Sequence, residues 1–190
     1  MNTHVSKHGT EPLAPLIEIR DATVFRGSTR VFHHFSLNLE QGCNTAILGP
    51  NGAGKTTLIN LITGVHPANS GSIVFDGANV TRQKPFQAAR RGIARTFQIV
   101  QPFPEMTVLQ NVTAGALFAR QSGSITNAVE ESREHLKFVG LDDLAETPAA
   151  SLTLPNRKRL ELAKSLAMRP RLLLLDEVNA GLNPTEISGA

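Results

Sequence analysis

Residues 49–56 constrain the fold of this 190-residue chain more than any other segment. They read Gly-Pro-Asn-Gly-Ala-Gly-Lys-Thr and match the pattern Gly-x4-Gly-Lys-Ser/Thr without a mismatch. Small residues allow successive backbone N–H groups to converge on phosphate oxygens, and a helix that follows directs the positive end of its dipole at the same anion. The segment therefore predicts a phosphate-binding loop with a strand before it and a helix after it.

The flanking residues fit this arrangement. The short run Thr45–Leu48 predicts a buried strand before the loop. A helix is predicted to begin near Gly54 and Lys55 and to end at Gly64, because apolar residues recur between them at helical spacing. The alternative, a glycine-rich turn with a chance lysine, does not explain this strand–loop–helix context.

The chemistry of the loop indicates a nucleotide and Mg²⁺ as its ligands, and the family resemblance described below implies that the nucleotide is ATP. Lys55 supplies a mobile positive charge for the β- and γ-phosphates, and the Thr56 hydroxyl is placed to hold Mg²⁺. We expect all residues of the loop, together with the first turn of the helix, to contact the nucleotide: Gly49, Pro50, Asn51, Gly52, Ala53, Gly54, Lys55, Thr56 and Thr57.

A second candidate site follows the apolar run Leu172–Leu175, which predicts a fully buried parallel strand. Asp176 and Glu177 come directly after it, and active sites of open parallel sheets lie at the carboxyl ends of strands. Asp176 can order a water or the Mg²⁺ held by Thr56, and Glu177 can polarise the water that attacks the γ-phosphate. For an isolated Asp-Glu pair an ordinary strand end would be preferred, but the phosphate loop upstream favours the catalytic interpretation.

The remaining pattern predicts an α/β layered fold. Strands are expected at 16–20, 31–39 and 72–75, and helices within 105–147 and over 156–168. Residues 1–15 are polar, contain proline and lack periodicity, so we expect a loose leader there.

Composition limits the classes of partner. The formal charge is 19 − 16 = +3, and the cluster Arg90, Arg91 and Arg95 has no interleaved aromatic residues, which favours a surface or subunit contact over a nucleic-acid site. No apolar run approaches the ~18–20 residues of a spanning helix, so the chain is expected to have no transmembrane segment of its own.

Taken in order, these motifs resemble the nucleotide-binding subunit of an ATP-binding cassette (ABC) transporter over nearly all of residues 16–187. The resemblance implies a P-loop NTPase core over 16–190, with an N-terminal antiparallel β subdomain and a helical subdomain inserted at about 100–168. It implies an ATPase whose hydrolysis of ATP drives transmembrane permease subunits, attached peripherally at the cytoplasmic face of the inner membrane.

The resemblance also assigns further residues. Arg95-Thr-Phe-Gln98 resembles the family's glutamine loop, in which Gln98 would contact Mg²⁺ and the attacking water and sense the membrane partner. Phe25 is similar to the aromatic position that stacks on adenine, with an ordinary core phenylalanine as the alternative. Ala180 to Asn183 falls where a segment crosses to the second ATPase subunit of a homo- or heterodimer.

Within the family, the sequences of the phosphate loop, of Arg95–Gln98 and of Ala180–Pro184 are most similar to those of importers of branched-chain amino acids. The ATPase of the lipopolysaccharide exporter shares much of these motif sequences and is the alternative relative within the family. Neither the solute nor the direction of transport follows from this resemblance, because membrane subunits and a separate binding protein set specificity in such systems.

One departure from the family lies at its signature loop, which usually reads Leu-Ser-Gly-Gly-Gln and closes over the partner's phosphate loop. This chain has Leu152-Thr-Leu-Pro-Asn156 there, and the contact with the partner would run through Thr153 to Asn156. Thr153 keeps a hydroxyl, whereas Pro155 lacks an N–H donor. The cations at 157–159 either supply charge in compensation or form a solvated helix face.

The second departure is the family's switch histidine, which follows the acid pair by some tens of residues. All six histidines precede Asp176, and 190 − 176 = 14 residues follow it. We therefore expect a C-terminally truncated ATPase domain that lacks the terminal strands of its sheet. A fragment that binds ATP without turning it over is the corresponding alternative function.

Overall fold

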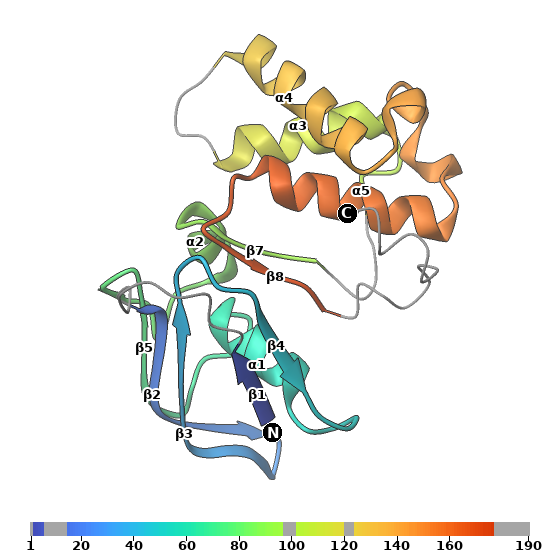
Figure 1. Cartoon of the computed structure of the whole chain (residues 1–190). Helices are drawn as coiled ribbons and strands as arrows, with labels where there is room; N and C mark the ends of the chain where they lie inside the picture. The colour runs from blue at the N-terminus through green and yellow to red at the C-terminus, as the bar shows by residue number, and fades with distance from the viewer. Residues whose placement is uncertain (1, 6–14, 97–101, 120–123, 177–190) are drawn as a thin grey trace. The chain divides into compact units, whose positions relative to one another are not determined.

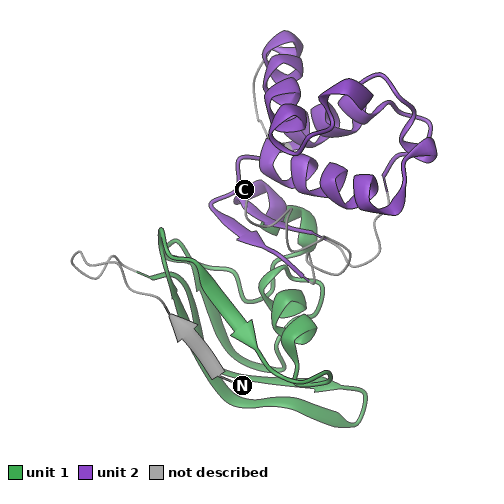
Figure 2. Ribbon diagram, turned by 45° about the vertical axis from the view of Figure 1, so that its right-hand side comes forward, with its two compact units in different colours: residues 1–88 green, residues 89–190 purple. Residues whose placement is uncertain are grey.

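The computed structural model describes residues 2–5, 15–96, 102–119 and 124–176. They divide into two compact units, residues 1–88 and 89–190 (Figure 2). Strands and helices occur in both units, which confirms the α/β class.

A four-stranded antiparallel sheet dominates the first unit (Figure 1). Its order is β3 (Thr29–Glu40), β2 (Pro15–Arg26), β5 (Ser70–Phe75) and β6 (Ala78–Asn79). The predicted strands at 16–20, 31–39 and 72–75 are therefore confirmed, and β2 and β3 are longer than their alternation indicated.

The register of this sheet brings apolar side chains of β2, β3 and β5 next to one another. Ile17 pairs with Leu39 on one side and with Phe75 on the other, and Ile19 pairs with Ile73. All five side chains are buried. Burial of an aliphatic or aromatic side chain stabilises a fold by about 1.5–3 kcal/mol, so this cross-strand cluster fixes the register of β2 between its neighbours.

The strand before the phosphate loop, β4 (Thr45–Leu48), pairs antiparallel with β1 (Asn2–Val5). A strand edge presents unpaired N–H and C=O groups that another extended segment can satisfy, which explains a strand inside the expected loose leader 1–15. The predicted burial of β4 is wrong, because its side chains alternate between half-buried and exposed and Leu48 is 59% exposed. In the described chain β4 pairs with β1 alone, and a two-stranded ladder covers little of its faces.

Helix α1 (Lys55–Ile62) follows the phosphate loop, as the apolar spacing predicts. Leu58, Leu61 and Ile62 are almost completely buried, so this face anchors the helix in the first unit. The helix ends at Thr63, whose hydroxyl donates a hydrogen bond of 2.8 Å to the Ile59 carbonyl.

In the second unit, β7 (Ile93–Arg95) pairs in parallel with β8 (Leu172–Leu174). The parallel pairing of the leucine run is confirmed, but its complete burial is wrong: only Leu174 is buried and Leu175 is 51% exposed. In the described residues β8 has β7 as its one strand neighbour, and two three-residue strands shield few side chains. Helix α2 (Pro85–Arg90) precedes β7 and spans the boundary between the units.

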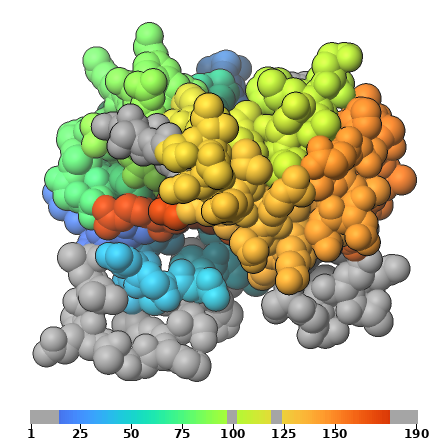
Figure 3. Space-filling view, turned by 90° about the horizontal axis from the view of Figure 1, so that it is seen from above, coloured from blue at the N-terminus to red at the C-terminus, as the bar shows by residue number. Residues whose placement is uncertain are grey.

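Three helices surround the core of the second unit: α3 (Val108–Ala119), α4 (Ile125–Phe138) and α5 (Leu154–Ala167). Short 3₁₀ turns at Asp142–Leu144 and Ala149–Ser151 lead from α4 to α5. Coloured yellow-green to orange, these segments lie next to one another in the space-filling view (Figure 3). No helix in the described ranges has the length and apolarity to cross a membrane.

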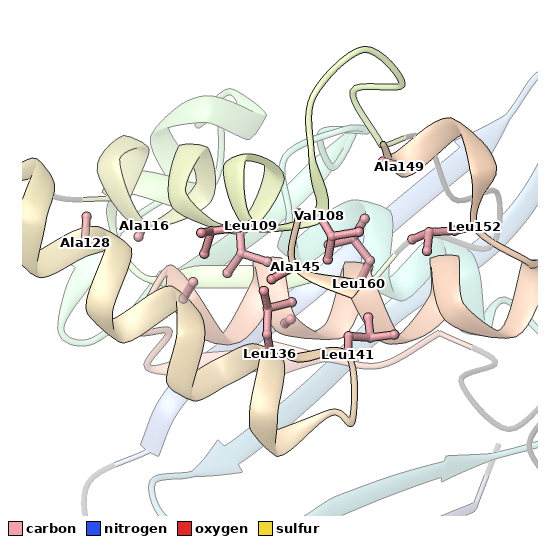
Figure 4. Packing of buried hydrophobic residues seen from close by; sticks show 13 residues of the cluster. Val108, Leu109, Ala116, Ala128, Leu136, Leu141, Ala145, Ala149, Leu152 and Leu160 are labelled. Atoms are coloured by element: carbon pink, nitrogen blue, oxygen red, sulfur yellow. The ribbon is translucent and has the colours of Figure 1, made fainter. Parts of the chain in front are cut away.

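The helices pack on a shared cluster of leucine, valine and alanine side chains (Figure 4). Its buried members are Val108, Leu109, Val112, Ala116, Ala128, Leu136, Leu141, Ala145, Ala149, Leu152, Leu160, Ala163 and Ala167. Members come from α3, α4 and α5, from the turn Ala149–Ser151 and from the residues that flank the turn Asp142–Leu144. The helical periodicity predicted within 105–147 and 156–168 is therefore confirmed as one packed helical core.

His135 on α4 makes the stability of this unit sensitive to pH. Burial, and then the nearby Arg169 guanidinium, lower the pKa of His135 below its ordinary value of 6.5, while Glu134 opposes the shift. Between the lowered pKa and about pH 6.5, the unfolded chain therefore binds more protons at His135 than the folded chain does. The contribution of neutral His135 to the free energy of unfolding is complete above that range, and it is lost as the pH falls through the lowered pKa.

We expect the free energy of unfolding, measured by urea denaturation, to fall between pH 7.5 and pH 5.5. The variant His135→Gln is expected to show a smaller fall, since it lacks the titrating ring. If wild type and variant lose the same stability over this range, His135 does not contribute to the pH dependence.

Candidate functional site

The phosphate loop joins β4 to α1 through a backbone that requires glycine. Gly52 has φ 80° and Gly54, the N-cap of α1, has φ 92°, both in the left-handed region. A Cβ atom at Gly54 would lie 3.0 Å from Val31 Cγ1 and 3.1 Å from the Phe32 ring. Both the backbone conformation and the available space therefore select glycine at position 54.

The backbone at the start of α1 presents N–H groups that can donate hydrogen bonds to a ligand. The Leu58 N–H donates to the Gly54 carbonyl at 2.9 Å, which closes the first helical turn. The N–H groups of the residues before Leu58 in a helix have no intrahelical acceptor, and they point out of the N-terminal end. Together with the helix dipole they form a site for an anion such as a phosphate group.

The Lys55 ammonium lies over the loop from which its helix begins. Its Nζ donates hydrogen bonds to the carbonyls of Gly49 at 2.7 Å and Pro50 at 2.9 Å. The positive charge is thus held at the same loop that presents the N–H donors. Thr56 is half-buried in the first turn, and Thr57 is buried at 8% exposure, so a nucleotide contact by Thr57 stays a prediction.

We expect Gly54→Ala to damage the loop without removing any charged group. Alanine at φ 92° is strained, and its Cβ forces Val31 or Phe32 to move. Strain of this kind costs about 1–3 kcal/mol, so ATP binding should weaken about 5- to 100-fold. The dissociation constant measured by calorimetry tests this, with Gly42→Ala as the control because it has a similar φ of 73° and no neighbour within 4 Å. Equal effects of the two changes would contradict a special role for Gly54.

Phe25 lies near the end of β2, opposite Arg30 in β3. Its side chain is 44% exposed, which excludes the alternative of an ordinary core phenylalanine. The backbone N–H of Phe25 donates to Asn69 Oδ1 at 2.9 Å, so the strand end that carries the ring is fixed. An exposed aromatic face on a fixed backbone can stack on a planar base.

Asp176 follows β8 and is buried, with 8% of its surface exposed. Its Oδ2 lies 3.7 Å from Arg95 Nη2, an ion pair too long for a hydrogen bond, and its N–H donates to Thr96 Oγ1 at 3.3 Å. Burial lowers the pKa of the Arg95 guanidinium, and the Asp176 charge opposes that shift. The carboxylate thus sits in a charged, mostly dry environment at the carboxyl end of the strand.

The burial of Arg95 differs from the prediction made from the sequence. The predicted surface cluster contains Arg90 and Arg91, which are exposed, whereas the Arg95 side chain is only 11% exposed. The parallel register pairs Arg95 with Leu174, two residues before Asp176, and so brings the two charges together. A strand of three residues is too short to show alternation, so the sequence carried no signal for the burial of Arg95.

The predicted signature segment leads into α5. Thr153 is the N-cap and its side chain makes no capping hydrogen bond, and Pro155 occupies the first turn. Arg157 Nε donates to the Leu152 carbonyl at 3.0 Å and its Nη2 donates to the Ala150 carbonyl at 2.7 Å. Arg157 is therefore tied to the segment before the helix rather than fully solvated, and compensation of Pro155 by a charge at 157–159 stays a prediction. The helix begins at Leu154, earlier than predicted.

The structure groups the predicted residues in two places. The phosphate loop and Phe25 belong to the first unit, and Asp176 with Arg95 belongs to the second. A joint site for the loop and Asp176 stays a prediction. Gln98, Glu177 and Ala180 to Asn183 lie outside the described residues.

The predicted ligands of Mg²⁺, one in each unit, suit this ion chemically rather than a transition metal. Thr56 and Asp176 offer a hydroxyl and a carboxylate, the oxygen ligands that Mg²⁺ prefers alongside substrate phosphates. Among the described residues no group of three or more His, Cys, Asp or Glu side chains could hold a metal ion by itself.

Comparison with known proteins gives consistent matches. Residues 32–180 match the ABC transporter family. The probable branched-chain amino acid transport ATP-binding protein LivG of Archaeoglobus fulgidus is 34% identical, over 89% of this chain and 70% of the relative. BraF, a high-affinity branched-chain amino acid transport ATP-binding protein of Pseudomonas aeruginosa, is 34% identical over 90% and 72%. The ribose import ATP-binding protein RbsA of Lacticaseibacillus paracasei is also 34% identical, over 90% of this chain and 35% of the relative.

Solved structures agree in fold. MJ1267, an ATP-binding cassette of an ABC transporter, superposes with a TM-score of 0.79 at 30% identity, over 93% of this chain and 74% of that chain. The cassette MJ0796 superposes with a TM-score of 0.80 over 90% and 78%, and at 24% identity it supports the fold alone.

Proposed function

This chain belongs to the ABC transporter family, and we propose that it powers the import of branched-chain amino acids or similar solutes. Its family members are ATP-hydrolysing transporter subunits, and its fold is that of their P-loop NTPase cassettes. Two relatives named for branched-chain amino acid transport match over 70% and 72% of their length. A ribose import protein is equally identical, which makes a sugar the alternative solute.

The phosphate loop is the observation that supports this function most strongly. The left-handed Gly54 opens the first turn of α1, and the Lys55 Nζ lies on the Gly49 and Pro50 carbonyls. In the proposed complex the N–H groups of the loop hold the β- and γ-phosphates and Lys55 adds its charge.

Adenine recognition is assigned to Phe25. Its exposed ring offers a stacking face, and the hydrogen bond from its N–H to Asn69 fixes the strand end beneath it. Stacking on a ring does not select among purines, so this contact supplies affinity rather than specificity.

Hydrolysis is assigned to the acid pair and the glutamine loop. Glu177 accepts a proton from the attacking water, and Gln98 positions that water next to the γ-phosphate. Thr56 and Asp176, with Gln98, would hold Mg²⁺, which neutralises charge on the phosphates when it is bound. The Arg95 guanidinium lies 3.7 Å from the Asp176 carboxylate and favours its charged form, so we assign Arg95 a positioning role.

The partners follow from the same function. ATP hydrolysis drives conformational change in transmembrane permease subunits. A second ATPase subunit completes the ATP site, and this chain contacts that subunit through Thr153 to Asn156 and Ala180 to Asn183. The Arg157 hydrogen bonds to the Leu152 and Ala150 carbonyls link the residues before this segment to the first turn of α5. We place the chain peripherally at the cytoplasmic face of the membrane, with an ATPase domain over 16–190 and its helical part over about 100–168.

Transport by the assembled system tests the solute. The chain is reconstituted with its permease subunits in vesicles that contain ATP, the separate binding protein is added outside, and uptake of labelled leucine and labelled ribose is compared. We expect ATP-dependent uptake of leucine in excess of ribose. Uptake of ribose alone would replace the branched-chain assignment by the sugar alternative, whereas the ATPase assignment would stand.

A further inference from the structure

A cavity of about 230 Å³ lies in the second unit where β7 and β8 begin. It is lined by the residues that lead into these two strands, namely Ala89, Arg90, Arg91, Gly92, Ala167, Met168, Arg169 and Arg171. Asp176 follows the opposite end of β8. The cavity is therefore distinct from the site of Asp176.

The lining of this cavity is basic. Four of its eight residues are arginines and none is acidic. The four arginines are exposed, so a ligand in solution can reach them. Arginine presents a planar fork of N–H donors that matches the oxygens of a phosphate group in a bidentate manner.

Two of the arginines have contacts that hold them at the cavity. The Arg90 guanidinium lies over the Phe118 ring, 6.0 Å from its centroid, and Arg169 forms an ion pair with Glu131. Neither Phe118 nor Glu131 lines the cavity itself. These contacts reduce the freedom of two long side chains, which lowers the entropy that a bound anion must overcome.

Arg169 occupies a backbone conformation that favours glycine. It has φ 49° directly after the C-cap of α5, where a left-handed glycine commonly ends a helix. A strained non-glycine residue points to a use for its side chain. A cation near a helix C-terminus also stabilises the helix dipole, and the experiment below separates that explanation from ligand binding.

The volume of the cavity limits the size of the ligand. Pockets for drug-sized molecules enclose about 300–1,000 Å³, so this cavity suits a smaller group. We infer that Arg90, Arg91, Arg169 and Arg171 bind the phosphate group of a small phosphorylated molecule or of an anionic phospholipid. Both sources present the same chemistry to the four guanidinium groups.

Binding to the full-length chain tests this site at about 150 mM salt, where weak surface attraction is screened. An excess of Mg²⁺ and a non-hydrolysable ATP analogue occupies the phosphate loop. Glycerol 3-phosphate is titrated in one arm, and vesicles of phosphatidylglycerol or of phosphatidylcholine are sedimented with the protein in the other. Saturation by glycerol 3-phosphate identifies a soluble ligand, and binding only to phosphatidylglycerol vesicles identifies the lipid.

Variants assign the binding to the cavity. Arg91→Gln and Arg169→Gln should each weaken binding about tenfold, the effect of losing a charge-assisted hydrogen bond. Arg91→Lys should retain part of it, because the charge remains without the fork. Arg133→Gln removes the same charge from α4, outside the cavity, and should leave binding unchanged.

Arg169→Gly separates a ligand site from a structural cation. We expect an unchanged or higher melting temperature together with weakened binding, because glycine suits φ 49° but supplies no guanidinium. The proposal is overturned if wild type binds neither probe, if Arg133→Gln weakens binding as much as Arg91→Gln, or if the three Arg91 and Arg169 variants that remove charge bind normally. Failure of the ATP analogue to bind would count against the proposed function and not against this site.

Discussion

The variant Lys55→Met is expected to lose ATP binding almost completely. The Lys55 ammonium is the charge that the phosphate loop holds through the Gly49 and Pro50 carbonyls, and methionine keeps the length of the side chain without the charge. Hydrogen bonds to charged groups are worth about 1.5–3 kcal/mol, and two phosphates lose their partner at once. We therefore expect the dissociation constant for ATP to rise at least a hundredfold in a calorimetric titration.

Lys84→Met serves as the matched control for this prediction. Lys84 is exposed in the same unit and lies outside the loop, so the control removes an equal charge. The control variant should bind ATP like wild type, and both variants should unfold cooperatively. Wild-type affinity in Lys55→Met would show that the nucleotide does not bind at this loop.

Glu177→Gln is expected to have the second large effect, this time on turnover. A glutamine keeps the size of the side chain and cannot accept a proton from water. General-base catalysis contributes about 10²–10⁴-fold, so the rate of ATP hydrolysis should fall by that factor. The dissociation constant for ATP should stay within about twofold of wild type, because the loop that holds the phosphates is unchanged.

The rate is measured as phosphate release and the affinity by titration on the same preparation. Glu130→Gln, an exposed glutamate on α4, is the control for the loss of one carboxylate. Persistent turnover in Glu177→Gln would remove Glu177 from the water-polarising role. A simultaneous loss of ATP binding would assign it to nucleotide binding instead.

The elements with strong local signals could be predicted from the sequence. The octapeptide 49–56 predicted a strand, a loop and a helix, and all three are present. The alternation in 16–20 predicted β2, and the apolar spacing in 105–147 predicted helices that share one core. These signals are local, since a strand or a helix repeats its pattern within a few residues.

Features that depend on pairing between distant segments could not be predicted. Strand β7 has three residues and takes its identity from β8, which lies 77 positions or more along the chain. The burial of Arg95 against Asp176 depends on that pairing, and so the sequence alone indicated a surface or subunit-contact residue. In the same way β1 exists through its ladder with β4, and its polar sequence carries no strand signal.

Steady-state ATP hydrolysis by the purified chain, alone and with its permease subunits, tests the assignment most directly. Magnesium-dependent phosphate release is expected from the wild-type chain, with little release from Lys55→Met or Glu177→Gln. The absence of release under both conditions, from a protein that still binds ATP, would contradict an ATP-hydrolysing subunit and would support a protein that binds ATP without turning it over.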